Sequence, residues 1–144
     1  MNQALLVGVD CSDCSDRALE YAADMAKSSG ASILIVHVIE WSPYSFNTPT
    51  ENEERHKRRE EEIGRALTSA VDPAVRRLSE QGIECRGMVR HGHAAETLKR
   101  VADEESVTNI IVGRTGSSRI KAQLFGSVAG TLVQISSQPV TVVP

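Results

Sequence analysis

The 144-residue sequence has few aromatic residues, no long apolar run and no large excess of either charge. Aromatic residues make up 3% of the chain, which argues against binding single-stranded nucleic acid by stacking bases on aromatic rings. The formal net charge of −3 provides no general attraction for a polyanion. We therefore expect no nucleic-acid partner, and any bound phosphate must be held by local geometry.

Export and membrane signals are also missing. No apolar run approaches the roughly 20 residues that a membrane-spanning helix needs. The N-terminus lacks the basic segment and apolar stretch of a secretory signal. Three cysteines, an odd number, then favour reduced thiols in a cytosol. We expect a cytoplasmic protein that does not contact a membrane.

What the chain does contain is a series of short apolar segments rich in β-branched residues. Such segments, apolar on both faces, are typical of strands covered on both sides. Four are clear, at residues 4–9, 32–39, 109–113 and 140–143. The segment 84–90 alternates and carries charge, so it is predicted at or near one edge of the sheet.

Helical patterns fill the intervals between these segments. Pro73 lies within the longest of them and predicts a kink or a break, and the last is mostly apolar and is expected to be well buried. Strands alternating with helices predict right-handed crossovers and an open parallel sheet with helices on both faces. No repeat or linker interrupts the pattern, so residues 1–144 are predicted to form a single domain. The predicted helices cover residues 16–28, 52–81, 94–105 and 127–137.

A group of glycines follows the fourth apolar segment, where an open parallel sheet binds its ligands. Gly113 would let a planar group approach the main chain, and Gly116 permits a turn whose amides point inward. Gly126, Ser127 and Val128 open the last helix, whose free N–H groups favour phosphate. A glycine-rich connection with a capped helix is the alternative interpretation.

Two other phosphate-binding loops do not fit the sequence. A Walker A loop and a Gly-x-Gly-x-x-Gly fingerprint after the first strand are both missing. The chain is also short for the two halves of a dinucleotide fold, so a mononucleotide fits better.

The spacing Gly-x2-Gly-x9-Gly-Ser at 113–127 resembles the ATP-binding signature of the universal stress proteins, in their UspA-like branch. The resemblance extends over 5-LLVGVDCSDCS-15, 34-LIVHVIE-40 and 138-QPVTVVP-144. It implies a Rossmann-like sheet, similar to the adenine nucleotide alpha hydrolases, with five strands in the order 3-2-1-4-5. It also implies a homodimer, or a higher oligomer, formed through the last strand, Val140 to Val143.

The same resemblance implies positions around the nucleoside. Asp10, with Val9 beside it, would lie near the adenosine, and the main chain of Val38 would bind the adenine edge. Val112 and Gly113 would flank the ribose.

The phosphates would lie against Gly116, Gly126, Ser127 and Val128, with Mg²⁺ or Mn²⁺ held by the nucleotide. Asp10 is the only obvious acid at this site, and no arginine finger is identifiable. We therefore expect an ATP-responsive stress-response module with little or no turnover, not an enzyme with an assigned catalytic residue. A slow ATPase or phosphotransferase, and an interaction protein without nucleotide, are the alternatives.

The pair Cys11 and Cys14 has the Cys-x-x-Cys spacing of a redox dithiol at the start of a helix. The chain ends too soon after Pro139 to complete a thioredoxin-like fold, and the acidic Ser-Asp spacer is expected to oppose thiolate formation at Cys14. A thiol redox protein that uses Cys11 and Cys14 therefore stays only as a further alternative, beside a redox-sensitive thiol at Cys11 and two small residues at a helix entrance. A zinc site would need a second pair of ligands beside Cys11 and Cys14. Cys85 stands alone, and the two histidines of the His-Gly-His at 91–93 have the wrong spacing for such a pair.

Two further segments carry predictions. Residues 40–51 are interpreted as a surface loop or as a lid over the ligand. His37, in the second predicted strand, is expected to be a hydrogen-bonded core histidine, and Gly92 is expected to set the bend into the helix at 94–105.

Overall fold

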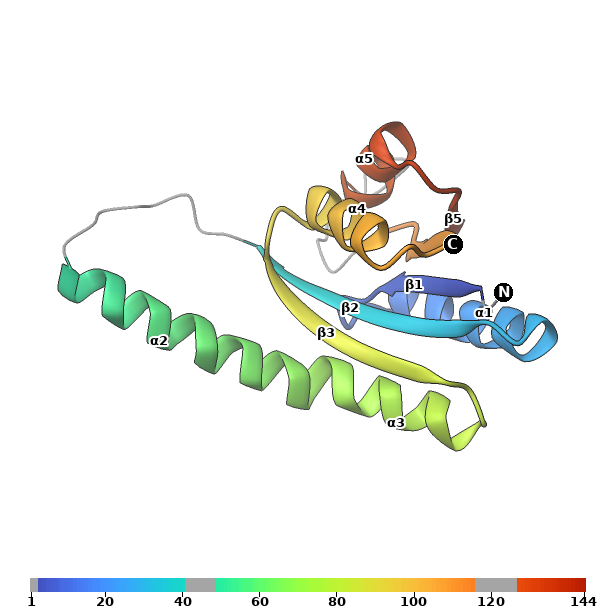
Figure 1. The fold of residues 1–144 in the computed structure, drawn as a ribbon, viewed down its shortest axis with the longest axis horizontal. Helices are drawn as coiled ribbons and strands as arrows, with labels where there is room; N and C mark the ends of the chain where they lie inside the picture. Colours follow the sequence, from blue (N-terminus) through green and yellow to red (C-terminus); the bar gives the residue numbers. More distant parts are fainter. Residues whose placement is uncertain (1–2, 41–48, 116–126) are drawn as a thin grey trace.

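The computed structural model of the chain describes residues 3–40, 49–115 and 127–144. Within them, parallel strands form one sheet in the order β3-β2-β1-β4-β5 (Figure 1). This is the predicted order, and helices lie on both faces as expected. The weakly apolar segment forms β3 at one edge, as its charge indicated. The strands are β1 (Ala4–Gly8), β2 (Ser32–Glu40), β3 (Cys85–Gly92), β4 (Asn109–Gly113) and β5 (Val140–Val143).

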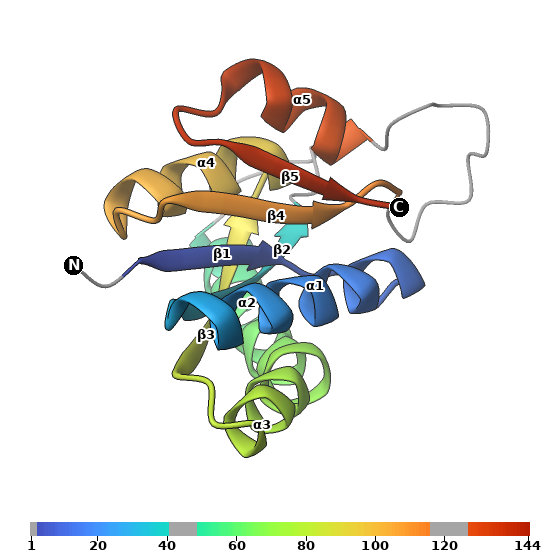
Figure 2. The same ribbon diagram turned by 90° about the vertical axis from the view of Figure 1, so that its right-hand side faces the viewer.

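Two apolar layers separate the sheet from its helices. One layer joins the sheet to α1 (Asp13–Ser29), α3 (Asp72–Glu80) and the end of α2 (Pro49–Ala66). The other joins it to α4 (Ala94–Glu104) and α5 (Ser127–Ile135). Figure 1 shows α4 and α5 above the strands and α2 and α3 below them, and Figure 2 shows α1 running beside β1. The core therefore lies on both faces of β1, the central strand.

Helix α1 begins three residues earlier than predicted, at Asp13, because Ser12 caps it. The Ser12 hydroxyl accepts a hydrogen bond from the N–H of Ser15 at 3.1 Å, which satisfies a donor that the helix leaves free. Gly30 ends the helix as predicted, in the left-handed conformation with φ 75° and its N–H bonded to Ala26 O.

The predicted break at Pro73 is present. A π-helical turn, η1 (Leu67–Val71), separates α2 from α3, and Pro73 lies in the first turn of α3. Proline has no N–H and is tolerated at the start of a helix, where that donor is not needed. The expected loop at 40–51 is wrong at both ends, because β2 extends to Glu40 and α2 begins at Pro49; residues 41–48 lie outside the described part of the chain.

The prediction that the last helix is well buried is wrong for most of α5. Only Ala129 and Leu132 are buried in it, and the side chain of Val133 is 54% exposed. The helix contacts α4 and β5 and so covers the sheet with one face. Apolar composition on every face therefore overestimated its burial. No helix in the described ranges is long and apolar enough to cross a membrane.

Candidate functional site

The carboxyl end of β1 forms a tight polar turn. The Asp10 carboxylate accepts hydrogen bonds from the Ser12 N–H at 3.0 Å and from the Ser12 hydroxyl at 2.5 Å, both at Oδ1. The Asp10 N–H donates to the Ser15 hydroxyl at 3.3 Å. Short polar side chains bond to nearby main chain in this way at turns. The half-buried carboxylate is therefore held at the entrance to α1.

Val9 connects this turn to β2. Its N–H donates to the Val36 carbonyl at 2.9 Å, and its carbonyl lies 2.8 Å from Nδ1 of His37. A carbonyl only accepts, so Nδ1 carries the proton. His37 is hydrogen-bonded as predicted, although it is half-buried rather than fully enclosed.

Val38 lies where β2 extends past β1. The pairs between β1 and β2 end at Gly8 and Val36, while β2 remains paired with β3 up to Glu40 and Gly92. Val38 itself pairs with Arg90 of β3, and its half-buried side chain packs with the α4 and α5 layer. The edge of Val38 that faces β1 is consequently outside the β1–β2 ladder.

The carboxyl end of β4 lies against the start of α1. Val112 is 4% exposed within the core, and Gly113 is the last residue of the strand. A Cβ on Gly113 would lie 2.7 Å from Cys14 Cβ and 2.8 Å from the Cys14 carbonyl carbon. The space expected to admit a ligand at Gly113 is therefore taken, on its Cβ side, by the main chain of Cys14.

The predicted phosphate positions are described only in part. Ser127 is exposed at the first residue of α5, and Val128 beside it is half-buried. Gly116 and Gly126 lie outside the described residues. Val9, Asp10, Val112 and Gly113 lie at the carboxyl ends of the paired strands β1 and β4. The strand order reverses here, because β2 and β3 follow on one side of β1 and β4 and β5 lie on the other. An open α/β sheet accepts ligands at such a reversal.

The three cysteines are free thiols in different surroundings. Burial raises the pKa of exposed Cys11, and the carboxylates of Asp10 and Asp16 raise it further. Hydrogen bonds from the side chain and main chain of Thr115 lower the pKa of Cys14, and Arg17 lowers it as well. The expectation that the acidic spacer opposes thiolate formation at Cys14 is wrong, because these two donors contact its sulfur.

Metal ligands do not gather in the described part of the chain, where no three His, Cys, Asp or Glu side chains are placed to hold an ion. The Cys85 thiol donates to the Val75 carbonyl at 3.3 Å, and His91 lies 3.2 Å from Glu62. Cys85 and the histidines at 91 and 93 thus do not form the zinc site considered above.

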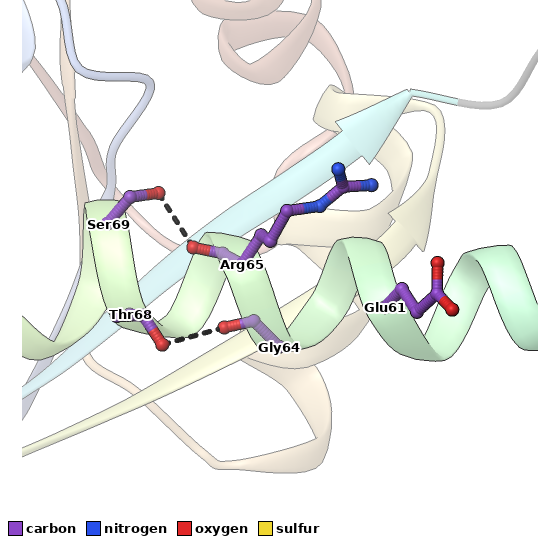
Figure 3. Close-up of a pocket in the computed structure, with 5 residues that line it drawn as sticks. All are labelled: Glu61, Gly64, Arg65, Thr68 and Ser69. Atoms are coloured by element: carbon purple, nitrogen blue, oxygen red, sulfur yellow. Dashed lines mark hydrogen bonds between the residues drawn. The ribbon is translucent and has the colours of Figure 1, made fainter.

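Two hollows lie away from this edge. Figure 3 shows one on the outer face of α2 and η1, lined by Glu61, Gly64, Arg65, Thr68 and Ser69. The hydroxyls of Thr68 and Ser69 donate to helix carbonyls at 3.0 and 2.7 Å. A second cavity, of about 150 Å³, lies at the starts of β1, β2 and β3. Neither hollow contains a predicted site residue.

Comparison with known proteins gives one consistent result. The model of the universal stress protein family matches residues 1–144. Universal stress protein YxiE of Bacillus subtilis is 28% identical over 156 residues, covering 99% of this chain and 99% of that protein.

Solved structures are similar over nearly the whole chain. The universal stress protein UspA from Lactobacillus plantarum superposes with a TM-score of 0.84 at 20% identity, covering 99% of this chain and 97% of that one. A universal stress protein crystallised in complex with cAMP gives a TM-score of 0.65 at 26% identity, covering 99% and 96%. The first shares the fold, and the second is a structure of that fold with an adenine nucleotide bound.

Proposed function

Because the chain belongs to the universal stress protein family, we propose that it binds an adenine nucleotide, ATP with Mg²⁺ or Mn²⁺, across the carboxyl ends of β1, β2 and β4. The observation that carries this proposal is the position of the Asp10 turn beside Gly113, where β1 and β4 adjoin. Adenine-nucleotide binding by the relative crystallised with cAMP supports it.

The nucleoside half of the proposed site uses three strand ends. The adenine edge would bind the main chain of Val38. This residue lies beyond the last pair between β1 and β2, on the edge of β2 that faces β1. Asp10, held by Ser12, would lie near the adenosine with Val9 beneath it. Val112 and Gly113 would border the ribose.

The phosphate half rests on the start of α5. Ser127 offers an exposed hydroxyl and Val128 an N–H group in the first turn of the helix, where free amides and the helix dipole favour an anion. Gly116 and Gly126 complete the cradle in this proposal. The divalent ion would be held by the phosphates of the nucleotide.

A binding and regulatory role fits the site better than catalysis. General-base catalysis on the phosphates needs a carboxylate beside the attacking water. Asp10, which two hydrogen bonds from Ser12 orient at Oδ1, is expected near the nucleoside instead. We therefore propose a stress-response module that responds to nucleotide occupancy, with little or no turnover. A slow ATPase or phosphotransferase is the alternative, and it predicts phosphate release over many turnovers.

The proposed assembly is a cytoplasmic homodimer of a single domain over residues 1–144. Strand β5 is the sheet's edge, and its four residues are all half-buried. An apolar edge strand favours pairing with another strand. Sedimentation across a range of concentrations tests this, and a monomer throughout would contradict it.

Mass spectrometry of small molecules released by denaturing the purified protein tests the proposed ligand. We expect an adenine nucleotide in near-stoichiometric amount, and much less from Asp10→Ala. Asp24→Ala is the matched control, because Asp24 is an exposed carboxylate on α1. The absence of released nucleotide, together with no affinity for added ATP, would contradict the proposal.

A further inference from the structure

We propose that Cys14 is a modification site, a thiol that Arg17 and Thr115 hold ready for attack on peroxides and soft electrophiles. The nucleotide site does not use this thiol, and the proposal stands whether or not the chain binds ATP. Cys14 is the centre of a cluster drawn from α1 and the segment that follows β4.

The cluster brings two donors to one sulfur. Arg17 Nη2 donates to Cys14 Sγ at 3.0 Å, and Thr115 Oγ1 lies 3.1 Å from the same atom. Cys14 is also the second residue of α1, where free amides and the positive end of the helix favour a negative charge. Each of these contacts stabilises a thiolate more than a thiol, and the thiolate is the reactive form.

Neither of the other two thiols accepts a hydrogen bond from an arginine within the described residues, although Cys85 contacts the Ser79 hydroxyl at 3.3 Å. Partial burial raises the pKa of the Cys11 thiol above its usual value, and the carboxylates of Asp10 and Asp16 raise it further. Cys85 donates its proton to the Val75 carbonyl. The chain therefore separates exposure from acidity, because Cys11 is the exposed thiol and Cys14 is the acidic one.

Cys14 is 8% exposed, so access decides how fast it reacts. Its two polar partners, Arg17 and Thr115, are both exposed. Because the Thr115 hydroxyl contacts the sulfur, we expect a reagent to reach it when this side chain rotates away. We expect this movement to set the maximum rate, while the contacts of the sulfur set the pH at which the rate rises.

The reaction with hydrogen peroxide balances without another component. The thiolate sulfur of Cys14 attacks one peroxide oxygen and the O–O bond breaks. Hydroxide leaves and takes a proton from solvent to become water. The sulfur is oxidised to sulfenic acid and the peroxide is reduced.

Modification of the Cys14 sulfur should disturb the segments that follow β4 and β5. Arg17 also donates through Nε to the Pro144 carbonyl at 2.8 Å, and the Arg114 N–H donates to the Val143 carbonyl at 2.7 Å. Cys14 thus links the segment after β4 to the end of β5 through Arg17. An added oxygen or alkyl group displaces Thr115, Arg17 or both, which loosens this link.

The test is alkylation of the folded protein with iodoacetamide at a series of pH values, read for each cysteine by mass spectrometry. The rate at each thiol rises with its thiolate fraction, so the midpoint reports acidity and the plateau reports access. We expect the midpoint for Cys14 to lie below that of Cys11. A midpoint equal to or above that of Cys11, or no native-state labelling of Cys14, overturns the proposal.

Two variants identify the cause. Thr115→Val and Arg17→Gln should each raise the Cys14 midpoint and leave the rate of alkylation at Cys85 unchanged. Treatment with hydrogen peroxide and dimedone, which traps sulfenic acid, should place the adduct on Cys14 and lose it in Cys14→Ala. An unchanged midpoint in both variants, or an adduct confined to Cys11, contradicts the assignment.

Discussion

The end of β4 and the start of α1 are in main-chain contact, because Gly113 has no side chain facing Cys14. A Cβ at Gly113 would lie 2.8 Å from the Cys14 carbonyl carbon and 3.0 Å from its oxygen. Those atoms belong to the first turn of a capped helix, which cannot move as a flexible side chain does. This contact therefore holds the end of β4 against the start of α1, the helix that follows β1 at the proposed nucleoside site.

Gly113→Ala should consequently destabilise the protein and weaken nucleotide binding. The new methyl group forces a main-chain shift, and overpacking of this kind costs about 1–3 kcal/mol. Gly64→Ala is the matched control, because nothing lies within 4 Å of a Cβ there. In the exposed interior of a helix this control should stabilise by about 0.5–1 kcal/mol. Urea denaturation measures both, and equal effects would contradict the contact.

Gly87 provides a second test of close packing, at the junction of β3 with the π-helical turn. A Cβ there would lie 2.1 Å from Val71 Cγ1, and Val71 is completely buried. Gly87→Ala should destabilise by about 1–3 kcal/mol. The double variant with Gly87→Ala and Val71→Ala should lose less free energy of unfolding than the two single variants together. The new methyl group at residue 87 then fills part of the cavity that the smaller side chain at residue 71 leaves. Additive effects would mean that the two positions do not meet.

Ser12 caps α1 and holds Asp10, so its hydroxyl should matter twice. Ser12→Ala removes the acceptor for the Ser15 N–H and the donor to Asp10, and should cost about 0.5–2 kcal/mol of stability. It should also lower nucleotide affinity, because the carboxylate loses its fixed position. Ser28→Ala, whose hydroxyl only bonds to Met25 O on the exposed surface, should change stability by less than about 0.5 kcal/mol.

The carboxyl group of Asp103 should make the stability of the fold depend on pH in the acid range. Hydrogen bonds from Lys99 and Gln138 hold the pKa of this carboxyl below its ordinary value of 3.8. A depressed pKa stabilises the fold above the unfolded value, and the stabilisation is lost as pH falls through the folded value. Thermal unfolding should therefore show a shallower decline in Tm below pH 3.8 for Asp103→Asn than for the wild type. Parallel curves would contradict this contribution.

The pattern of apolar residues predicted most of the fold, because the spacing of these residues within each strand or helix can be read from a short stretch of sequence. Apolar runs, Gly30 and Pro73 indicated where strands, a helix end and a helix break occur, and the structure confirms all three. The burial of α5 was overestimated, because composition does not say how many faces of a helix are covered.

The acidity of Cys14 was not predictable from the Cys-x-x-Cys spacing. Nearby sequence supplies the acidic Asp13, whereas one of the two donors on the sulfur, Thr115, lies 101 residues away. Only Arg17, three positions along the same helix, carried a local signal, since residues at that spacing are neighbours on a helix surface. Site residues Gly116 and Gly126 remain predictions from the glycine spacing.

Calorimetric titration of nucleotide-free protein with ATP and Mg²⁺ tests the central claim most directly. We predict one site per chain, with an affinity reduced by about tenfold or more in Asp10→Ala, a loss of at least about 1.4 kcal/mol, and unchanged in Asp24→Ala. An absence of binding heat for ATP, ADP, AMP and cAMP at several temperatures, or an affinity that Asp10→Ala leaves unchanged, would contradict a nucleotide site at the carboxyl ends of β1 and β4.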